Sequence, residues 1–481
     1  MSLFRVPPLF LLLVLLGSGH GRAQNPLAGS WRGSLLIGGS RLEITLRCSA
    51  QGDSLAAVMD IPQQGASGLR LANVRVRLPE VHFELSAGPG LAVFDGTLRA
   101  DSITGEFRQA SFTGTFALAR MVPETFPYRV EEVRFTGDSI ALQGTLTLPE
   151  GAGPFPAVVL IAGSGGVDRD ELVFGFPVFK VLADTLTRRG IAVLRYDKRG
   201  VGRSTGSLSG ATTEDLARDA GAALRVLREH EGIDLERVGL IGHSEGSAVA
   251  MVLAARDAEG VAFVIAVAGA AVDGERLALD QVDRIEVLKG TPRAEIDRLL
   301  TLQREVFAAA KTGTIGEPLR TKLREEFRRE IERQLSAMPR EQRSQLPGSD
   351  SLASLRVNAE VATLTSRWYR SFLNSDPAVT IRSVRVPVLA LFGEKDVQVA
   401  PALNRVPMEK ALGLPGESSH SVVVIGGANH LFQEAQSGGP WEYGRLKREF
   451  HPEFIGRLIQ WIHEPGAKGQ WASPGEKEKP G

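Results

Sequence analysis

The sequence is poor in cysteine, with Cys48 as its single thiol in 481 residues. One thiol cannot form an internal disulfide, and it lacks the further cysteines of a cysteine-based zinc site. We therefore expect Cys48 to be a small buried residue on a strand, and we exclude thiol-nucleophile chemistry. The eight histidines show no His-x-x-x-His spacing. The sequence accordingly predicts no metal site and no cofactor.

The chain also lacks an excess of charge, because 56 basic residues balance 56 acidic ones. A neutral balance gives no electrostatic basis for binding nucleic acid or an anionic membrane.

Long apolar runs are absent after the N-terminus, where the run 9–16 follows Arg5 and precedes the small-residue site Gly21-Arg-Ala23. This pattern predicts a signal peptide at residues 1–23, since the run is too short to span a bilayer. No cysteine near the cleavage site could carry a lipid. We expect a secreted or periplasmic protein without an integral membrane segment.

The most informative motif present is Gly242-His-Ser244-Glu-Gly246. The apolar run 238–241 precedes it and a helical stretch, 247–256, follows it. A strand, a tight Gly-x-Ser-x-Gly turn and a helix form a nucleophile elbow, in which the glycines avoid collisions with the neighbouring strand and helix. Ser244 is therefore the candidate nucleophile.

The same pattern occurs a second time, at Gly202-Arg-Ser204-Thr-Gly206. Ser204 follows the polar segment Asp197-Lys-Arg-Gly-Val and runs into more serine and glycine. Without a strand before it and a helix after it, the motif lacks the context of an elbow. We interpret this second copy as an ordinary turn.

A serine needs a base to accept its proton and a carboxylate to orient that base. Asp396 follows the strand-like run 386–392, and His430 follows the run 421–425. We assign these two residues as acid and base. The rival acid is Glu394. Of the rival histidines, His243 is more plausible as a packing residue beside the nucleophile, and His420 precedes its strand, at the wrong edge of a parallel sheet.

The catalytic part of the chain has the pattern of a mostly parallel, doubly wound α/β sheet. Continuous apolar runs of strand length predict strands buried on both faces, and helical stretches such as 213–230 join them. In such a sheet the loops after the strands share one edge, so Ser244, Asp396 and His430 can meet. Their order, serine, acid, histidine, is that of the α/β-hydrolases. The runs are 158–162, 191–196, 238–241, 261–267, 388–392 and 422–425.

One connection is much longer than the others. Residues 273–372 are rich in Arg, Glu, Lys and Leu, and segment 323–335 places apolar residues on one helical face. This region predicts an inserted helical cap over the catalytic edge of the sheet.

The oxyanion of an acyl-transfer intermediate needs two backbone N–H donors. One donor should be the amide of Glu245, directly after the nucleophile. The buried run ending at Ala162 leads into Gly163-Ser164-Gly165-Gly166, and Ser164 is the first choice for the other donor, with Gly165 second. The competing interpretation of this loop is a plain strand-to-loop turn.

Residues 24–120 show a different periodicity. Short segments with alternating apolar and polar residues, separated by Gly, Pro and Asp turns, predict a small antiparallel all-β domain, either a sandwich or a small barrel. The segments are 41–47, 74–78, 81–85, 92–98 and 111–118. Further strands between 128 and 148 are expected to begin the hydrolase sheet, and the Gly-, Pro- and Lys-rich tail 465–481 is expected to be disordered.

Residues 128–464 resemble the α/β-hydrolase superfamily, and in particular exported bacterial esterase-like serine hydrolases with an N-terminal β-domain. The resemblance lies in five segments, 163–171, 194–204, 241–246, 392–399 and 429–433. It implies Ser244 as nucleophile, Asp396 as acid, His430 as general base, and Ser164 with Glu245 as oxyanion hole. Many relatives carry histidine before the oxyanion glycine, where this chain has Ala162, which leaves the second donor open.

From these residues we expect an exported serine hydrolase that cleaves small carboxylic esters through an acyl-enzyme. Two alternatives stay open. A peptidase on the same fold would share the triad, and a free-amine pocket lined by cap carboxylates would favour it. A non-catalytic surface protein, whose β-domain binds a polymer, is the other. The sequence leaves the oligomeric state open.

Overall fold

The computed structural model describes residues 25–466, except 38–39, 52–53, 62–65, 87–89, 111, 123–124, 257–259, 337–342, 344–345 and 416–418. The signal peptide predicted at 1–23 lies outside the described residues, as does the predicted tail beyond residue 466. The described chain divides into two compact units, one up to residue 122 and one from residue 125 onward.

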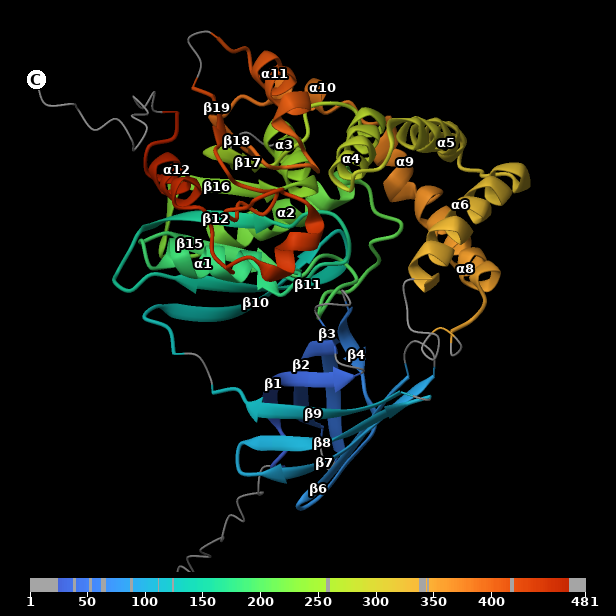
Figure 1. The fold of residues 1–481 in the computed structure, drawn as a ribbon. Coiled ribbons are helices and arrows are strands. Elements are labelled where there is room, and N and C mark those ends of the chain that lie inside the picture. Colours follow the sequence, from blue (N-terminus) through green and yellow to red (C-terminus); the bar gives the residue numbers. More distant parts are fainter. Residues whose placement is uncertain are drawn as a thin grey trace, which may run out of the picture. The chain divides into compact units, whose positions relative to one another are not determined.

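The first unit is a nine-stranded antiparallel sheet with the order β4-β3-β2-β1-β9-β8-β7-β6-β5 (Figure 1). The sheet curls until its ends approach, and the N–H of Leu71, between β4 and β5, donates to the carbonyl of Ala57 in β3 at 2.9 Å. The predicted all-β unit is therefore one nearly closed sheet and not two stacked sheets. The strands are β1 Gly29–Ile37, β2 Ser40–Gln51, β3 Ser54–Ile61, β4 Ala66–Arg70, β5 Ala72–Arg77, β6 Glu80–Ser86, β7 Leu91–Arg99, β8 Ser102–Gln109 and β9 Phe112–Arg120.

Alternation along these strands builds the core of the first unit. In β6, Val81, Phe83 and Leu85 are buried, while the residues between them face outward. The Phe83 ring stacks on that of Phe94 at a centroid distance of 4.8 Å. Cys48 is buried in this core, as predicted, and burial raises the pKa of its thiol to about 12.

The second unit contains an eight-stranded mixed sheet with the order β10-β11-β15-β12-β16-β17-β18-β19. From β15 to β19 neighbouring strands run parallel, whereas β10 and β11 form an antiparallel hairpin beside β15. The strands are β10 Arg129–Gly137, β11 Ile140–Leu148, β12 Phe155–Ile161, β15 Ala192–Tyr196, β16 Ile233–His243, β17 Phe263–Val267, β18 Val388–Gly393 and β19 Ser421–Ile425, with a separate small hairpin of β13 Leu172–Val173 and β14 Phe176–Pro177.

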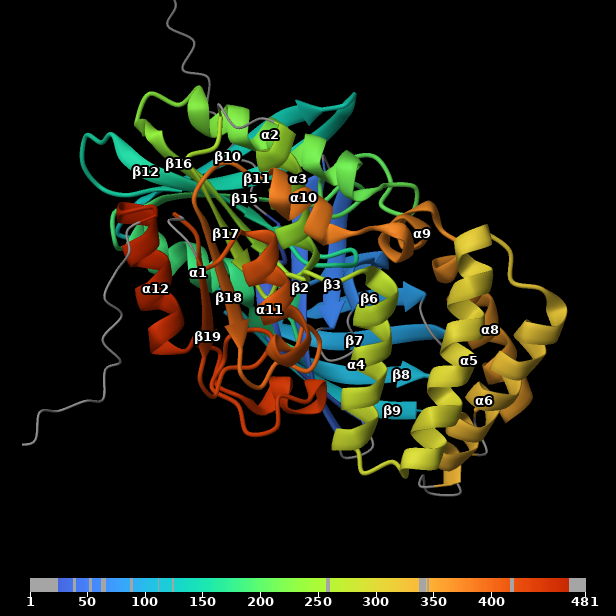
Figure 2. The same ribbon diagram turned by 90° about the horizontal axis from the view of Figure 1, so that it is seen from above.

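Helices cover both faces of this sheet, as a doubly wound fold requires. Helices α1 and α12 lie on one face, and α2 and α3 lie on the other (Figure 2). Strands β12, β15, β17 and β18 are buried along almost their whole length, because apolar residues face both layers of helices. The helices are α1 Val178–Thr187, α2 Thr213–Arg228, α3 Glu245–Arg256, α11 Pro401–Ala411 and α12 Pro452–His463, with a 3-10 helix η2 at Pro440–Arg445.

Among the described residues, six helices between β17 and β18 form the inserted cap, in agreement with the predicted fold class. Five of these, α4, α5, α6, α8 and α9, pack around a small core of their own, which includes Val306, Phe307, Leu323, Val357 and Leu364. Within the described residues, no helix is both long enough and apolar enough to cross a membrane. The cap helices are α4 Gly274–Leu288, α5 Arg293–Thr312, α6 Glu317–Ser336, α8 Ser349–Leu364, α9 Arg367–Asn374 and α10 Pro377–Ser383.

Candidate active site

Ser244 lies between the end of β16 and the start of α3, in the turn that the motif predicts. Its φ is 53°, a left-handed conformation that is uncommon for a residue other than glycine. Its N–H donates to the carbonyl of Val267 at the end of β17 at 2.8 Å. The neighbouring strand therefore fixes the strained turn that presents the serine.

The two glycines of this motif are required by close packing. A methyl group on Gly242 would lie 2.1 Å from the carbonyl oxygen of Gly246, and one on Gly246 would lie 1.9 Å from the carbonyl oxygen of Ile161. Any side chain at these positions would push α3 away from β12 and β16. The local sequence thus allows the sharp reversal that places Ser244 at the carboxyl edge of the sheet.

Asp396 and His430 are far apart in the sequence and meet at the same edge. His430 Nδ1 lies 2.8 Å from Asp396 Oδ2, and both side chains are almost fully buried. Asp396 Oδ1 accepts hydrogen bonds from the N–H groups of Gln398 at 2.7 Å and Val399 at 2.8 Å. The pair is thus held in a defined orientation by the loop after β18.

The carboxyl of Asp396 is ionised at neutral pH. Burial by itself would raise its pKa, but the imidazole of His430 and the two backbone donors outweigh burial and hold the pKa below its ordinary value. An ionised carboxylate only accepts hydrogen bonds. His430 Nδ1 therefore carries the proton of this hydrogen bond, and Nε2 is the ring atom left to act as a base.

Contacts of the His243 side chain bring the loop of His430 close to the candidate nucleophile. The ring of His243, which precedes Ser244, lies 4.8 Å from the ring of His430, centroid to centroid. His243 Nε2 lies 3.1 Å from the carbonyl oxygen of His430. No hydrogen bond between Ser244 Oγ and His430 is present among the described contacts, which is compatible with a base whose bond to the nucleophile tightens only with substrate.

The rival residues take other roles. Glu394 is exposed and accepts a hydrogen bond from the N–H of Gly427 at 2.8 Å. His420 accepts one from the N–H of Val388, at the start of β18 and thus at the opposite edge of the sheet. Of the rivals, only His243 lies at the site, as the packing residue that the sequence predicts.

His243 forms a buried ion pair that sequence reasoning missed. Its Nδ1 lies 2.9 Å from Glu171 Oε1, and the side chains are 6% and 2% exposed. Its Nε2 must donate, because the carbonyl of His430 can only accept. Burial lowers the pKa of His243, but the Glu171 carboxylate overcomes this and raises the pKa above its ordinary value. Both ring nitrogens of His243 thus face acceptors, an arrangement that favours the charged form of the ring.

Glu171 also narrows the choice of oxyanion donors. Its Oε1 accepts a hydrogen bond from the N–H of Gly163 at 2.7 Å, so this amide is not available to a substrate. The next two residues, Ser164 and Gly165, are exposed, and their N–H groups have no acceptor among the described residues. The structure therefore leaves both predicted alternatives free to bind an oxyanion.

The other predicted donor residue, Glu245, begins α3, and its side chain joins the cap to the core. Glu245 Oε2 lies 3.0 Å from Lys198 Nζ, and Oε1 accepts a hydrogen bond from the indole N–H of Trp368 in α9. The neighbouring Arg367 lies 3.8 Å from Asp215, at the start of α2. Two successive residues of the cap thus contact the core, one at Glu245 in α3 and one at Asp215 in α2.

A cavity of about 330 Å³ lies next to these contacts, between α3 and helices α9 and α10 of the cap. Its walls are both apolar and polar and include Ala248, Met251, Ser371 and Ile381. The cap therefore helps to form a space beside the elbow helix, and none of the predicted catalytic residues lines it.

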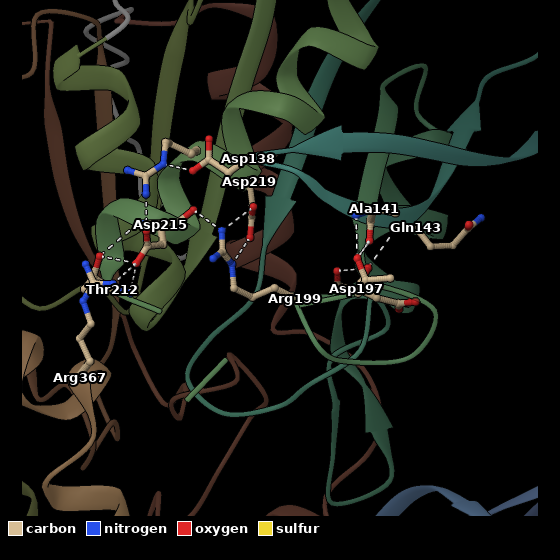
Figure 3. A network of polar contacts seen from close by, with 12 residues as sticks. Asp138, Ala141, Gln143, Asp197, Arg199, Thr212, Asp215, Asp219 and Arg367 are labelled. Atoms are coloured by element: carbon tan, nitrogen blue, oxygen red, sulfur yellow. Dashed lines mark hydrogen bonds and ion pairs between the residues drawn. The ribbon is translucent and has the colours of Figure 1, made fainter. Parts of the chain in front are cut away.

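The second Gly-x-Ser-x-Gly motif forms a turn that hydrogen bonds hold against β11. Ser204 Oγ donates to the carbonyl of Asp197 at 2.8 Å and accepts from the N–H of Gln143 at 3.0 Å. Thr205 bonds to Ala141 of β11 through its N–H and its side chain. Figure 3 shows Ala141 and Gln143, the two β11 residues of this network, close to Asp197.

Ionic contacts hold the segment before this turn. The carboxylate of Asp197 accepts hydrogen bonds from the guanidinium of Arg169, with Nη2 at 2.8 Å, and from the backbone N–H of Arg203. Arg199 makes a bidentate pair with the buried Asp219, at 2.7 and 2.8 Å (Figure 3). Burial is the main cause that raises the pKa of Asp219, and Arg199 lowers it only in part. These contacts are structural, and none involves Ser244.

Comparison with known proteins relates this site to a family. The sequence profile of the family described as Hydrolase_4, serine aminopeptidase S33, matches residues 177–432, a little more than half of the chain. Esterase EstD of Thermotoga maritima is 26% identical over 360 residues, which cover 74% of this chain and 72% of EstD. A thiohydrolase of Aspergillus aculeatus is 34% identical over 122 residues, which cover 25% of this chain and 36% of the relative.

Solved structures of two other proteins also align with most of this chain. A proline iminopeptidase of Mycobacterium smegmatis aligns over 70% of this chain and 99% of its own, at 19% identity and a TM-score of 0.41. An esterase of Pyrococcus furiosus aligns over 72% and 97%, at 13% identity and a TM-score of 0.42.

Proposed function

The chain belongs to the Hydrolase_4 family of serine hydrolases, and on that premise we propose that it is an exported enzyme that cleaves carboxylic esters of small molecules. The observation that carries the proposal is the buried hydrogen bond between His430 Nδ1 and Asp396, which lies beside the elbow that presents Ser244. The family match and the esterase of Thermotoga maritima support a hydrolase acting on a small substrate.

In the proposed reaction, His430 Nε2 accepts the proton of Ser244 as the serine attacks the ester carbonyl. The ionised Asp396 keeps His430 in the required tautomer and stabilises the imidazolium that forms. The N–H groups of Glu245 and Ser164 stabilise the oxyanion of the tetrahedral intermediate. The imidazolium then protonates the leaving alcohol, and an acyl-enzyme remains on Ser244.

Water completes the cycle. His430 takes a proton from the water that attacks the acyl-enzyme, and it returns a proton to Ser244 as the carboxylic acid leaves. All the groups used are side chains or amides of this chain, and we expect no cofactor to be needed.

Ester cleavage is favoured over aminopeptidase activity by the pairing of the carboxylates around Ser244. An aminopeptidase holds the ammonium group of its substrate, which requires a carboxylate that is not already neutralised. Here Asp396 is bonded to His430, Glu171 to His243, and Glu245 to Lys198 and Trp368. An ester without a free amine needs no such carboxylate.

An aminopeptidase is the second candidate, and one cap residue favours it. Glu360 in α8 is partly buried and forms no hydrogen bond or salt bridge within the described chain. Burial raises its pKa, and Arg356 lowers it only in part. Its charge also acts on Tyr369, the neighbour of Trp368 in α9. In this second candidate, Glu360 would be the carboxylate that binds the ammonium group of the substrate.

A paired assay separates the two candidates. The purified chain is given a short-chain nitrophenyl ester and an aminoacyl nitroanilide, and a fluorophosphonate probe is mapped by mass spectrometry. The proposal expects a kcat/KM for the ester at least about 100-fold above that for the nitroanilide, with the probe on Ser244. A preference for the nitroanilide that Glu360→Gln abolishes would establish the aminopeptidase instead. Absence of probe labelling would contradict both.

Export is proposed from the N-terminal sequence alone. Arg5, the apolar run and the small residues up to Ala23 form the pattern of a cleaved signal. Expression of the full-length chain in a bacterium, followed by N-terminal sequencing of the exported fraction, should find a new N-terminus at Gln24. Retention of the uncleaved chain in the cytoplasm would contradict export.

A further inference from the structure

Both backbone groups of Gly163 are held by buried ionic side chains. Its N–H donates to Glu171 Oε1 at 2.7 Å, and its carbonyl accepts from Lys198 Nζ at 2.8 Å. Lys198 is 6% exposed, and its second partner is Glu245 Oε2 at 3.0 Å. An ammonium group therefore lies between the loop after β12 and the first residue of the elbow helix.

The carbonyl of Gly163 belongs to the same peptide unit as the N–H of Ser164. A trans peptide unit is planar, and its C=O and N–H point in opposite directions. A donor that fixes the carbonyl therefore also fixes the direction of the Ser164 N–H. Gly163 lies at the nucleophile, since a methyl group added to it would be 3.4 Å from Ser244 Cβ.

We propose that Lys198 is a positioning residue of the oxyanion hole, which orients and polarises the peptide unit between Gly163 and Ser164. This inference rests on the proposed function, since it requires an oxyanion at Ser244. Lys198 does not contact the substrate. A charged donor on the carbonyl draws electron density from the amide and makes the Ser164 N–H a stronger donor.

The second hydrogen bond of Lys198, to the Glu245 carboxylate, links the Ser164 amide to the residue that supplies the other proposed oxyanion donor. Glu245 supplies the second oxyanion N–H from its backbone, and its carboxylate is bonded to Lys198 and to Trp368 of the cap. One side chain therefore sets the relative positions of the two donor residues, which come from the loop after β12 and from helix α3.

A purely structural ion pair would hold the same residues without influence on the oxyanion, so the test must report on the oxyanion itself. A thionoester places sulfur where the ester has its carbonyl oxygen, and an oxyanion hole stabilises the oxygen anion better. Weakening one donor should therefore lower the ratio of ester to thionoester kcat, whereas a loss of folded protein would leave this ratio unchanged.

Lys198→Met alone would leave the Glu245 carboxylate buried without its cation, which by itself can destabilise the fold. The experiment therefore compares Lys198→Met/Glu245→Gln with Glu245→Gln, in which Lys198 can still donate to Gly163. Active sites are counted with a fluorophosphonate, so that kcat refers to folded enzyme. Lys311→Met/Glu275→Gln, which makes the same pair of substitutions at a more exposed ion pair within the cap, is the control.

We expect the double variant to show a kcat about 10-fold below that of Glu245→Gln with little change in KM, since loss of a direct donor costs about 100-fold or more. The ratio of ester kcat to thionoester kcat should also fall in the double variant. In Lys311→Met/Glu275→Gln this ratio should equal that of the wild type.

A kcat equal to that of Glu245→Gln would overturn the inference, as would a lower kcat with an unchanged ratio. Failure of the proposed function is seen separately, with Lys198 and Glu245 left unchanged, as ester turnover that survives Ser244→Ala.

Discussion

The two Gly-x-Ser-x-Gly segments have the same pattern of residues and opposite surroundings. Ser244 has a φ of 53°, is partly exposed, and stands between a buried strand and a helix. Ser204 is buried, and both its donor and acceptor capacity are used by Asp197 and Gln143. The comparison teaches that the elements before and after the motif, and not the motif itself, decide whether its serine is presented at the edge of the sheet or is held inside a turn.

The sharpest way to break this comparison is to remove each hydroxyl. We expect Ser244→Ala to lower kcat for a nitrophenyl ester by about 10⁶-fold, because loss of the nucleophile leaves only the remainder of the site. Ser204→Ala should retain the wild-type kcat per active site and lose about 1 kcal/mol or more of stability, because the N–H of Gln143 loses its acceptor. Steady-state kinetics and urea unfolding measure both effects. Equal losses of activity would show that the two turns are not functionally distinct.

The carboxylates near the two serines extend the comparison. Asp396→Asn should lower kcat by about 10⁴-fold with the fold intact, because an amide favours the wrong tautomer of His430. Asp197→Asn should instead cost about 3 kcal/mol, since it leaves the guanidinium of Arg169 short of a partner. Kinetics normalised to titrated active sites should separate the two variants. A large loss of kcat in Asp197→Asn would place that turn in the active site.

The final glycine of each motif should also respond differently. Gly246→Ala would bring a methyl group 1.9 Å from a backbone oxygen of β12, so we expect a loss of about 3 kcal/mol and of most activity. At Gly206 the nearest atom is a side-chain carbon of Ile140 at 3.1 Å, and φ is 91°. Gly206→Ala should cost only about 1–2 kcal/mol. Urea unfolding measures the two losses of stability. A larger loss in Gly206→Ala than in Gly246→Ala would contradict the close packing of α3 on β12.

The smallest expected effect concerns the histidine beside Ser244, which has no counterpart beside Ser204. NMR of carbon-labelled histidines should give a pKa of His243 above 6.5, and Glu171→Gln should lower this pKa, because the carboxylate that chiefly opposes burial is lost while the His430 carbonyl and the Asp396 charge remain.

The pair has a defined effect on stability. A pKa raised by folding contributes stability that is complete below pH 6.5 and is lost as the pH rises through the raised pKa. Glu106→Gln, at an exposed site in β8, is the control that should leave the titration of His243 unchanged. A pKa that does not move in Glu171→Gln would contradict the ion pair.

Much of the fold and of the proposed site could be predicted, because the signals are local. Continuous apolar runs predicted β12, β15 and β16 to β19. The elbow motif predicted that Ser244 lies in the turn between a strand and a helix, which are β16 and α3. Asp396 and His430 follow from a rule about sheet edges, and the structure brings them to 2.8 Å from one another. Their catalytic roles remain predictions.

The contacts that were missed are not local. Glu171 meets His243 across 72 residues and Lys198 meets Glu245 across 47. Neither pair has a spacing that sequence could reveal, although the Glu171 and Lys198 positions fall within segments that carried the family resemblance. In the first unit, β1, β3, β4 and β8 were not predicted. β4 is only five residues long and contains two polar residues and a glycine, so its strand structure depends on pairing with β3.

The left-handed backbone at residue 244 has a consequence for the evolution of this chain. Glycine adopts that conformation freely, so Ser244→Gly should make the protein about 1 kcal/mol more stable while it removes the hydroxyl. If Ser244 is the nucleophile that we propose, selection for turnover and selection for folding act in opposite directions at this position. The serine would then be retained for its chemistry, at the expense of some stability.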